Sequence, residues 1–366
     1  MSEWKEYKLG DIITLNYGKS LPVNKRNNGD IPVYSSAGLT GWNDKALVNS
    51  KGLIVGRKGS IGKIYKSETP FFPIDTSYFV LPDNDIYDFD FLFYLLGSIG
   101  LDELNEDSAV PGLNRNTVYS QLISLPPLPE QKAIASVLSS LDDKIDLLHQ
   151  QNKTLEAMAE TLFRQWFVED AKDDWEAGCL DDIADVNPTY QLKKGLISTY
   201  LEMKNLSNTN FNPENWCQRK FTSGMKFHNG DTLLARITPC LENGKTCFVT
   251  FLEDKEIGWG STEYIVLRMK EPFHPYISYI IAKDKDFRDF AISSMTGSSG
   301  RQRAQANVIK KYDITIPPSN IIEQLNNHLA GITFKLKINA NQIRTLEKLR
   351  DTLLPKLMSG EVRVSI

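Results

Sequence analysis

Two stretches of the chain place apolar residues alternately four and three residues apart, the pattern of a helix that packs along another helix. The first stretch has the seam positions Ile134, Leu138, Leu141, Ile145, Leu148, Asn152, Leu155, Ala159, Leu162 and Trp166. The second stretch has Leu325, Leu329, Ile332, Leu336, Asn339, Ile343, Leu346, Arg350, Leu353 and Leu357, each 191 residues later. A pattern sustained over more than four heptads favours a coiled coil over helices that pack on a globular domain.

The two stretches also repeat each other in sequence. "QNKTLEAMAETL" at 151–162 and "QIRTLEKLRDTL" at 342–353 keep an offset of 342 − 151 = 191. "ISLPPLPEQ" precedes the first helix and "ITIPPSNIIEQ" precedes the second, and their Pro-Pro pairs keep the same offset, 317 − 126 = 191. The helical part of the chain is therefore a duplication.

The segments before the two helices match more loosely. "WKEYKLGDI" at 4–12 and "WEAGCLDDI" at 175–183 share W-x4-L-x-D-I, and "TSYFVL" at 76–81 matches "TEYIVL" at 262–267. "GRKGSIGK" and "ARITPCLENGK" share a leading Arg and a closing Gly-Lys. We therefore predict an α+β protein with two α/β domains separated by two long helices. The expected ranges are 1–125 and 171–316 for the domains, and 126–170 and 317–366 for the helices.

Composition narrows the function classes. The chain has 366 residues, enough for two or three domains, and a net charge of −4, which argues against wrapping DNA by bulk electrostatics. Local basic patches or a basic partner would still allow DNA binding. The polar N-terminus and the lack of a long apolar stretch predict a cytoplasmic protein. The four cysteines form no C-x-x-C pair, so neither a disulfide framework nor a zinc site is expected.

Two motifs that resemble catalytic sequences lack essential residues. "GRKGSIGKI" has Arg57 where a phosphate-binding loop needs Gly, and Ile64 where it needs Ser or Thr. "VNPTY" at 186–190 resembles the Asn-Pro-Pro-Tyr of amino-methyltransferases but lacks the second proline, so it is interpreted as a turn after a strand. The sequence therefore predicts no catalytic site and no metal site.

The chain resembles the specificity subunits of type I restriction–modification systems. The resemblance rests on "LPPLPEQKAIASVLSSLDDKIDLLHQQNKTLEAMAETLFRQWF", on the C-terminal "LRDTLLPKLMSGEV", and on "GDTLLARITPCLENGKTCFV" followed by "GSTEYIVL". It covers essentially the whole chain. It implies that each globular domain is a target recognition domain that reads one half of a bipartite site in double-stranded DNA.

The same resemblance implies a set of partners. The helices would form an antiparallel coiled coil that sets the gap between the half-sites. Two modification (methyltransferase) subunits would dock on the helical repeats, and restriction (motor-nuclease) subunits would join them. S-adenosylmethionine, ATP and Mg would bind to those partner subunits, and this chain would carry no cofactor and no catalysis of its own.

Candidate DNA contacts are basic or amide side chains outside the helices, because these groups read base edges. In the first domain they are Lys19, Arg57, Lys58, Lys63, Asn114 and Arg115. In the second domain they are Arg236, Lys245, Arg301, Gln302 and Arg303, the last three within the Gly/Ser-rich run "TGSSGRQRAQAN". Each residue taken singly also fits an ordinary solvated surface charge, so the clusters carry the prediction.

The polar seam positions predict the helix register. If the helices are antiparallel and related by a pseudo-twofold axis, the offset places Asn152 opposite 191 + 148 = 339, which is Asn339. Leu148 then faces Ile343. We expect one asparagine amide to bond the other, because a slipped register would bury an asparagine against leucine. The alternative is a splayed seam with both asparagines in water.

Two other functions stay open at this stage. A duplicated coiled-coil scaffold that joins protein partners would show no sequence-selective DNA binding. A self-contained methyltransferase, suggested by "NPTY", would bind S-adenosylmethionine as an isolated chain.

Overall fold

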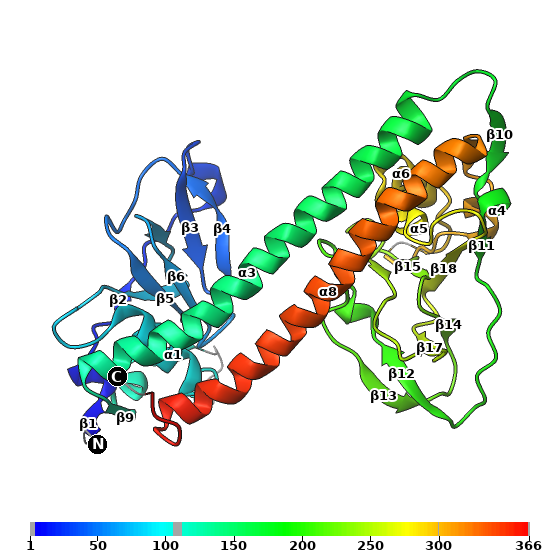
Figure 1. Ribbon diagram of the computed structural model, residues 1–366. Helices are drawn as coiled ribbons and strands as arrows, with labels where there is room; N and C mark the ends of the chain where they lie inside the picture. Colours follow the sequence, from blue (N-terminus) through cyan, green and yellow to red (C-terminus); the bar gives the residue numbers. More distant parts are fainter. Residues whose placement is uncertain (1–3, 105–111, 299, 365–366) are drawn as a thin grey trace. The chain divides into compact units, whose positions relative to one another are not determined.

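The computed structural model describes residues 4–104, 112–298 and 300–364. The chain divides into two compact units, Met1–Ile145 with Thr345–Ile366, and Asp146–Arg344. Helices α3 (Leu128–Arg164) and α8 (Ser319–Met358) contribute a different part to each unit (Figure 1). The boundaries expected from the sequence separate helices from domains instead, so the division into independently folding domains stays a prediction.

The described residues of the first unit form a globular domain with nine strands and two α-helices. Its strands are β1 (Lys5–Lys8), β2 (Asn16–Tyr17), β3 (Ile31–Ser35), β4 (Gly38–Asn43), β5 (Gly52–Gly56), β6 (Ile64–Ser67), β7 (Phe72–Pro73), β8 (Ser77–Val80) and β9 (Leu122–Leu125). Its helices are α1 (Phe89–Ser98) and α2 (Arg115–Tyr119). They begin where a side chain caps them, since Asp88 accepts from the N–H of Phe91 and Asn114 from that of Asn116.

In the second unit the part of the chain that the structure describes forms a globular domain with ten strands and four α-helices. Its strands are β10 (Glu176–Cys179), β11 (Ala184–Val186), β12 (Ile197–Leu201), β13 (Cys217–Lys220), β14 (Met225–Phe227), β15 (Thr232–Ala235), β16 (Thr246–Phe248), β17 (Gly258–Gly260), β18 (Tyr264–Met269) and β19 (Asp313–Ile316). Its helices are α4 (Leu180–Ile183), α5 (Ile277–Lys283), α6 (Lys285–Ser293) and α7 (Ala306–Ile309). A π-helical turn, Gln165–Glu169, extends α3.

The two globular domains share one topology. An antiparallel sheet of order β2-β8-β5-β6 in the first matches β11-β18-β15-β16 in the second, and the pair β1-β9 matches β10-β19. The other sheet, β4-β3-β7, matches β13-β12-β17, with a parallel contact between β3 and β7 and between β12 and β17. The second domain adds β14 at the edge of this sheet. The loose sequence match between the domains therefore reflects a real structural repeat.

The structural alignment of β8 with β18 is shifted by one residue from the alignment that their sequences suggest. Aligning "TSYFVL" with "TEYIVL" equates Tyr78 with Tyr264. In the sheets, however, Gly56 pairs with Ser77 whereas Ala235 pairs with Tyr264. Strand register depends on which backbone groups pair, and one residue of slip exchanges the two faces of a strand. The structurally equivalent residues are therefore Thr76 and Glu263, each just before its strand.

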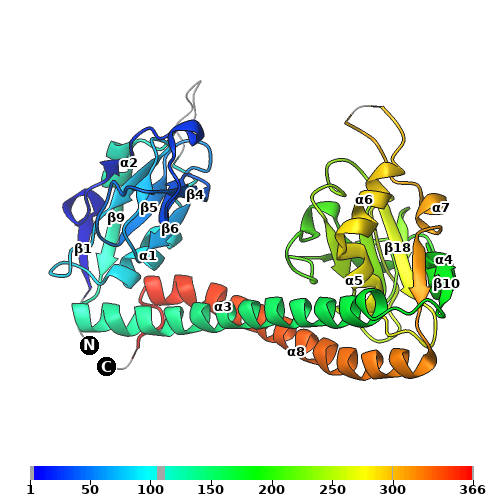
Figure 2. The same ribbon diagram turned by 90° about the horizontal axis from the view of Figure 1, so that it is seen from above.

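Burial explains why the central strands read as apolar runs. β5 and β15 are buried on both faces, so their side chains do not alternate with polar ones. Leu53 and Val55 pack in one core with Phe91 and Leu92 of α1. In the second unit Leu234 of β15 packs in one core with α5, α6 and the adjoining parts of α3 and α8. Figure 2 shows α5 beside α3.

Helices α3 and α8 are antiparallel in each unit. In the second unit Asn152 contacts Asn339, and further along α3 the ring of Trp166 lies against that of His328, earlier on α8. In the first unit Asp142 pairs with Arg350 at 2.8 Å. None of the predicted seam positions is exposed. The predicted class, two α/β domains with an antiparallel coiled coil, is confirmed.

The predicted asparagine contact is present. Asn339 donates from Nδ2 to Oδ1 of Asn152 at 2.9 Å, and both side chains are buried. The splayed, water-exposed alternative is therefore wrong for this pair. That the contact sets the helix register stays a prediction.

Candidate functional site

Arg57 lies at the exit of β5 and is held by its own backbone. Its N–H donates to the carbonyl of Thr76 at 2.9 Å, and its carbonyl accepts from the N–H of Leu113 at 2.9 Å. Its guanidinium lies over the rings of Tyr17 and Tyr78, with centroid distances of 5.2 and 5.7 Å. Its Nε is buried, and within the described residues no group accepts a hydrogen bond from it.

Tyr17 joins Arg57 to a second arginine. Arg115, the first residue of α2, lies over the Tyr17 ring at 5.3 Å, and Asn114 caps the same helix. Tyr17 is 49% exposed. The structure thus brings Arg57, Asn114 and Arg115 around an exposed aromatic ring. Sequence reasoning missed Tyr17, because it lies on a two-residue strand and reaches the arginines only through pairing of β2 with β8.

The three lysines predicted in the first domain are exposed but do not form one cluster. Lys58 follows Arg57 directly, and its N–H donates to the same Thr76 carbonyl. Lys63, at the far end of the β5–β6 turn, lines a cavity together with Asp142 and Arg350. The N–H of Lys19 donates to the carbonyl of Pro73. Of these three lysines, Lys58 is the one next in sequence to Arg57, which contacts the Tyr17 ring.

Arg236 holds the corresponding place in the second domain. Directly after β15, its N–H donates to the carbonyl of Glu263 at 2.9 Å and its carbonyl accepts from the N–H of Ala304 at 2.8 Å. As with Arg57, its Nε is buried without an acceptor among the described residues. The loop containing Arg301, Gln302 and Arg303 precedes Ala304, and Gln302 accepts from the N–H of Thr238 at 3.0 Å.

Arg303 anchors this loop. Its Nε and Nη2 donate to the carboxylate of Glu263 at 2.8–2.9 Å, and Nη1 donates to the carbonyl of Arg301 at 3.1 Å. The hydrogen bonds that Arg303 donates to Glu263 raise the pKa of Arg303. A further backbone pair joins Thr296 to Arg303 at the base of the loop. Arg301 is the more exposed of the two arginines, and the side chain of Arg303 keeps a relative exposure of 40% beside Glu263.

Lys245 is held by backbone carbonyls. Its Nζ donates to the carbonyls of Lys204 and Met203 at 3.0 and 3.4 Å. It is half-buried, and its backbone N–H donates to Cys240. The structure therefore gives this side chain a role in holding the turn Met203–Asn205, which the sequence did not indicate.

The "VNPTY" segment is a turn, as interpreted from its sequence. β11 ends at Val186, and Asn187 has a positive φ of 59°. Asn187 donates from its N–H to the carbonyl of Val266 and accepts from the N–H of Val266 through Oδ1. Tyr190 donates to the buried carboxylate of Asp231, which also pairs with Arg268 at 2.6 Å. These contacts hold the turn against the sheet.

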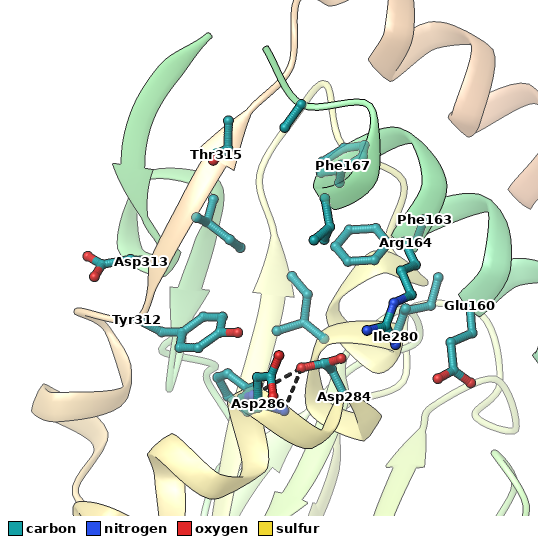
Figure 3. A pocket seen from close by; sticks show the side chains of 15 residues that line it. Glu160, Phe163, Arg164, Phe167, Ile280, Asp284, Asp286, Tyr312, Asp313 and Thr315 are labelled. Atoms are coloured by element: carbon teal, nitrogen blue, oxygen red, sulfur yellow. Dashed lines mark hydrogen bonds between the residues drawn. The ribbon is translucent and has the colours of Figure 1, made fainter. Parts of the chain in front are cut away.

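A cavity of about 250 Å³ lies in the second unit where the end of α3 meets α5, α6 and β19 (Figure 3). The stacked rings of Phe163 and Phe167 line it. Four carboxylates also line it, together with Arg164: Glu160, Asp284, Asp286 and Asp313. Burial and the neighbouring carboxylates raise the pKa of Tyr312, another lining residue, to about 12.

The first unit has a cavity in a matching place. It measures about 310 Å³ and lies where the end of α8 meets α1. Asp351 and Leu354 line it. These residues follow Glu160 and Phe163 by 351 − 160 = 191 and 354 − 163 = 191 positions. Each repeat thus places a carboxylate and an apolar side chain at equivalent points of a cavity.

No helix among the described residues is long and apolar enough to cross a membrane. Within the same residues, no three His, Cys, Asp or Glu side chains gather in a metal-binding arrangement.

Comparison with known proteins places the chain in a family. The family model for the type I restriction modification DNA specificity domain matches residues 1–157 and 172–347. The type I restriction enzyme MjaIX specificity subunit of Methanocaldococcus jannaschii is 24% identical, with 99% of this chain and 94% of that protein covered. The HindI specificity subunit of Haemophilus influenzae is 23% identical, with 99% and 100% covered.

The fold has a solved counterpart. The crystal structure of the type I restriction–modification S subunit from M. genitalium matches 98% of this chain and 96% of its own, with a TM-score of 0.64 at 16% identity. The family model covers both repeats of the chain. This chain therefore belongs to the type I restriction–modification DNA specificity family, as a specificity subunit and not a catalytic one.

Proposed function

We propose that the chain reads a bipartite DNA target, one half-site with each globular domain, and assembles the modification subunits around it. The observation that supports this most directly is that the chain repeats one domain topology, and that the helix following each copy pairs with the other helix in antiparallel fashion. Loops on a shared scaffold suit recognition of different sequences. A scaffold for protein partners alone would not need two repeated domains with basic clusters at the same strand exit.

The two domains present different chemistry to DNA. The first has the exposed Tyr17 between Arg57 and Arg115, and the second has a loop anchored by the Arg303–Glu263 pair. Arginine donates two hydrogen bonds to a base edge or a phosphate, so both surfaces suit DNA. Their difference supports two unlike half-sites and an asymmetric target.

The matched cavities support docking of two copies of one partner. Their equivalent carboxylates, Glu160 and Asp351, would contact a polar or basic side chain of the partner, with Asp351 also paired to Arg350 at 2.9 Å, and Phe163 and Leu354 would contact its apolar neighbours. We infer that the two modification subunits dock near these points, with restriction subunits joining them. S-adenosylmethionine, ATP and Mg belong to those partners in this proposal.

Exchange of one domain tests the proposal. The chain is expressed with its modification subunit, and methylated adenines are mapped across a genome. Exchanging Trp4–Leu125 for the matching domain of a relative is expected to change one half of the methylated motif completely and leave the other half and the gap unchanged. The reason is that each domain has its own core and its own basic surface.

The controls separate the rival functions. The purified chain alone, given S-adenosylmethionine and DNA, is expected to methylate nothing, whereas a self-contained methyltransferase would. A change in both halves after the exchange would contradict independent reading. A complex that methylates without a bipartite motif would contradict the proposal itself.

The loop of the second domain gives a narrower prediction. Replacing Arg301 and Arg303 together with alanine is expected to weaken DNA binding by the assembled complex by about tenfold to a hundredfold, with assembly intact. Arg301 alone should account for most of the loss, because Arg303 is already paired with Glu263. Fluorescence anisotropy with the target duplex measures binding, and size-exclusion chromatography checks assembly. Unchanged affinity of the double variant would show that both arginines are surface residues only.

A further inference from the structure

Arg57 and Arg236 occupy the same point of the repeated topology. Each follows the third strand of its antiparallel sheet, in the orders β2-β8-β5-β6 and β11-β18-β15-β16. The backbone N–H of each arginine donates to the residue just before the neighbouring strand, Thr76 or Glu263. The backbone carbonyl of each arginine accepts from a later segment, at Leu113 or Ala304. The last two are separated by 304 − 113 = 191, the offset of the helices.

These backbone bonds fix both arginines from two sides. The N–H of Arg57 donates to Thr76 and its carbonyl accepts from Leu113, and Arg236 makes the corresponding bonds to Glu263 and Ala304. The sequences around the two arginines otherwise diverge, from "GRKGSIGK" to "ARITPCLENGK". Because arginine occurs with the same backbone geometry in both domains, we infer that its side chain has a specific role and is not an ordinary surface charge.

Each guanidinium group also has one nitrogen without an acceptor among the described residues, whereas Nη2 of Arg57 donates to the carbonyl of Asp75 at 3.0 Å. The Nε atoms of Arg57 and Arg236 are buried and, among the described residues, have no acceptor. An unpaired buried donor is unfavourable because it has lost its hydrogen bonds to water, and such groups in native proteins are uncommon. Of the five side-chain atoms of this kind in the described chain, two are these equivalent Nε atoms. The coincidence argues for a shared function that outweighs the cost.

Another basic residue shares an aromatic ring with Arg57, and a further one lies three residues before Ala304, the backbone partner of Arg236. Arg115 reaches the first site through the Tyr17 ring, and Lys58 is adjacent in sequence. The loop with Arg301 leads directly into Ala304, which bonds Arg236. Phosphate contacts from the surrounding cations would position the duplex, while the fixed arginine faces a base edge. Arginine pairs most often with the O6 and N7 atoms of guanine.

We propose that Arg57 and Arg236 are the equivalent base-reading residues of the two domains, each donating to the edge of a guanine in its own half-site. This rests on the proposed function, because it requires that each domain read one half-site. Tyr17 and Tyr78 position the Arg57 guanidinium by stacking. In the second domain Arg236 is positioned by its backbone bonds to Glu263 and Ala304.

The test uses the complex of this chain with its modification subunit. Methylated motifs are mapped for the wild type and for Arg57→Gln, Arg57→Lys, Arg236→Gln and Arg236→Lys. Each Arg57 variant is expected to relax one G·C position in the first domain's half-site, and each Arg236 variant one position in the other half. Discrimination at that position should fall about tenfold or more, since a bidentate contact is lost. The untouched half-site is the internal control in every complex.

The lysine variants separate base reading from phosphate contact. Lysine keeps the charge of arginine but lacks its bidentate hydrogen-bonding geometry. If the arginine contacts only phosphate, the lysine variant would therefore keep that contact and the methylated motif would stay intact. An intact motif in the lysine variants, with uniformly weaker methylation in the glutamine variants, would overturn the assignment. A motif unchanged in all four variants would overturn it as well.

Folding and the wider proposal are checked separately. The circular dichroism spectrum and the elution volume of each complex show whether the variant folds and assembles; the lysine variants supply the measurement if a glutamine variant does not. A wild-type complex without a bipartite motif would contradict the proposed function. A bipartite wild-type motif that the variants leave unchanged would contradict only the role of Arg57 and Arg236.

Discussion

Replacing Glu156 with glutamine is expected to stabilise the second unit by about 3 kcal/mol at pH 8.5 and by less than about 1 kcal/mol at pH 5. Glu156 lies on α3 and accepts a hydrogen bond from the Tyr279 hydroxyl of α5 at 2.9 Å. Burial raises the pKa of its carboxyl to about 7, against smaller opposing effects of Tyr279, the Phe211 backbone and Lys283. Glu160, one turn further along α3, raises the pKa slightly.

The pH dependence of this stability change follows from the direction in which the pKa of Glu156 is shifted. A carboxyl whose pKa is higher in the folded state binds a proton more tightly there than in the unfolded chain. Its stabilising contribution is complete below the ordinary pKa of glutamate, about 4.3, and is lost as the pH rises through about 7. Glutamine mimics the protonated form and keeps the bond from Tyr279, so the variant should lack this loss.

Hydrogen exchange measures the effect locally. The opening free energy of the α5 backbone amides is compared at pH 5 and pH 8.5 after correction for intrinsic exchange rates. Glu160→Gln is the matched control, because Glu160 is exposed on the same helix and contributes only slightly to the pKa of Glu156, so this variant should keep most of the wild-type pH dependence. Equal pH dependence in the wild type and in the Glu156→Gln variant would show that Glu156 stays ionised when folded.

Replacing Asn152 with leucine is expected to destabilise the helix pair by about 2 kcal/mol. Asn339 is fully buried, and its Nδ2 donates to Asn152 at 2.9 Å and to Gln151 at 3.4 Å. Its Oδ1 is buried without a donor among the described residues. The Asn152→Leu variant removes the better of its acceptors and leaves a buried amide against an apolar side chain.

The double variant with leucine at both positions is expected to regain that stability. Two leucines would pack in the seam without any unpaired polar group, as at the neighbouring positions Leu148 and Leu336. Hydrogen exchange of the α8 amides in all four proteins completes a double-mutant cycle. A single variant as stable as the wild type, or a double variant that loses the sum of both single losses, would contradict a coupled pair.

The candidate site was only partly predictable. Arg57, Asn114 and Arg115 were chosen as basic or amide residues outside the helices, and the structure gathers them. Tyr17 was missed because aromatic residues carry no spacing signal on so short a strand. Lys245 and Arg303 were expected as DNA contacts, but carbonyls hold one and Glu263 holds the other. Such pairings join residues more than 35 positions apart, so local pattern does not reveal them.

The sequence alone determined the duplication and the two long helices, and it predicted the Asn152–Asn339 contact on the condition that the helices are antiparallel, which the family resemblance implied. All of these depend on a short helical period and one constant offset, which are properties of the chain's order. Only the tertiary structure decided that α5 partly covers Glu156, outside the seam, and bonds it through Tyr279, and that Arg57 and Arg236 are equivalent. Burial and sheet pairing depend on which distant segments meet, and those contacts form only when the whole domain packs.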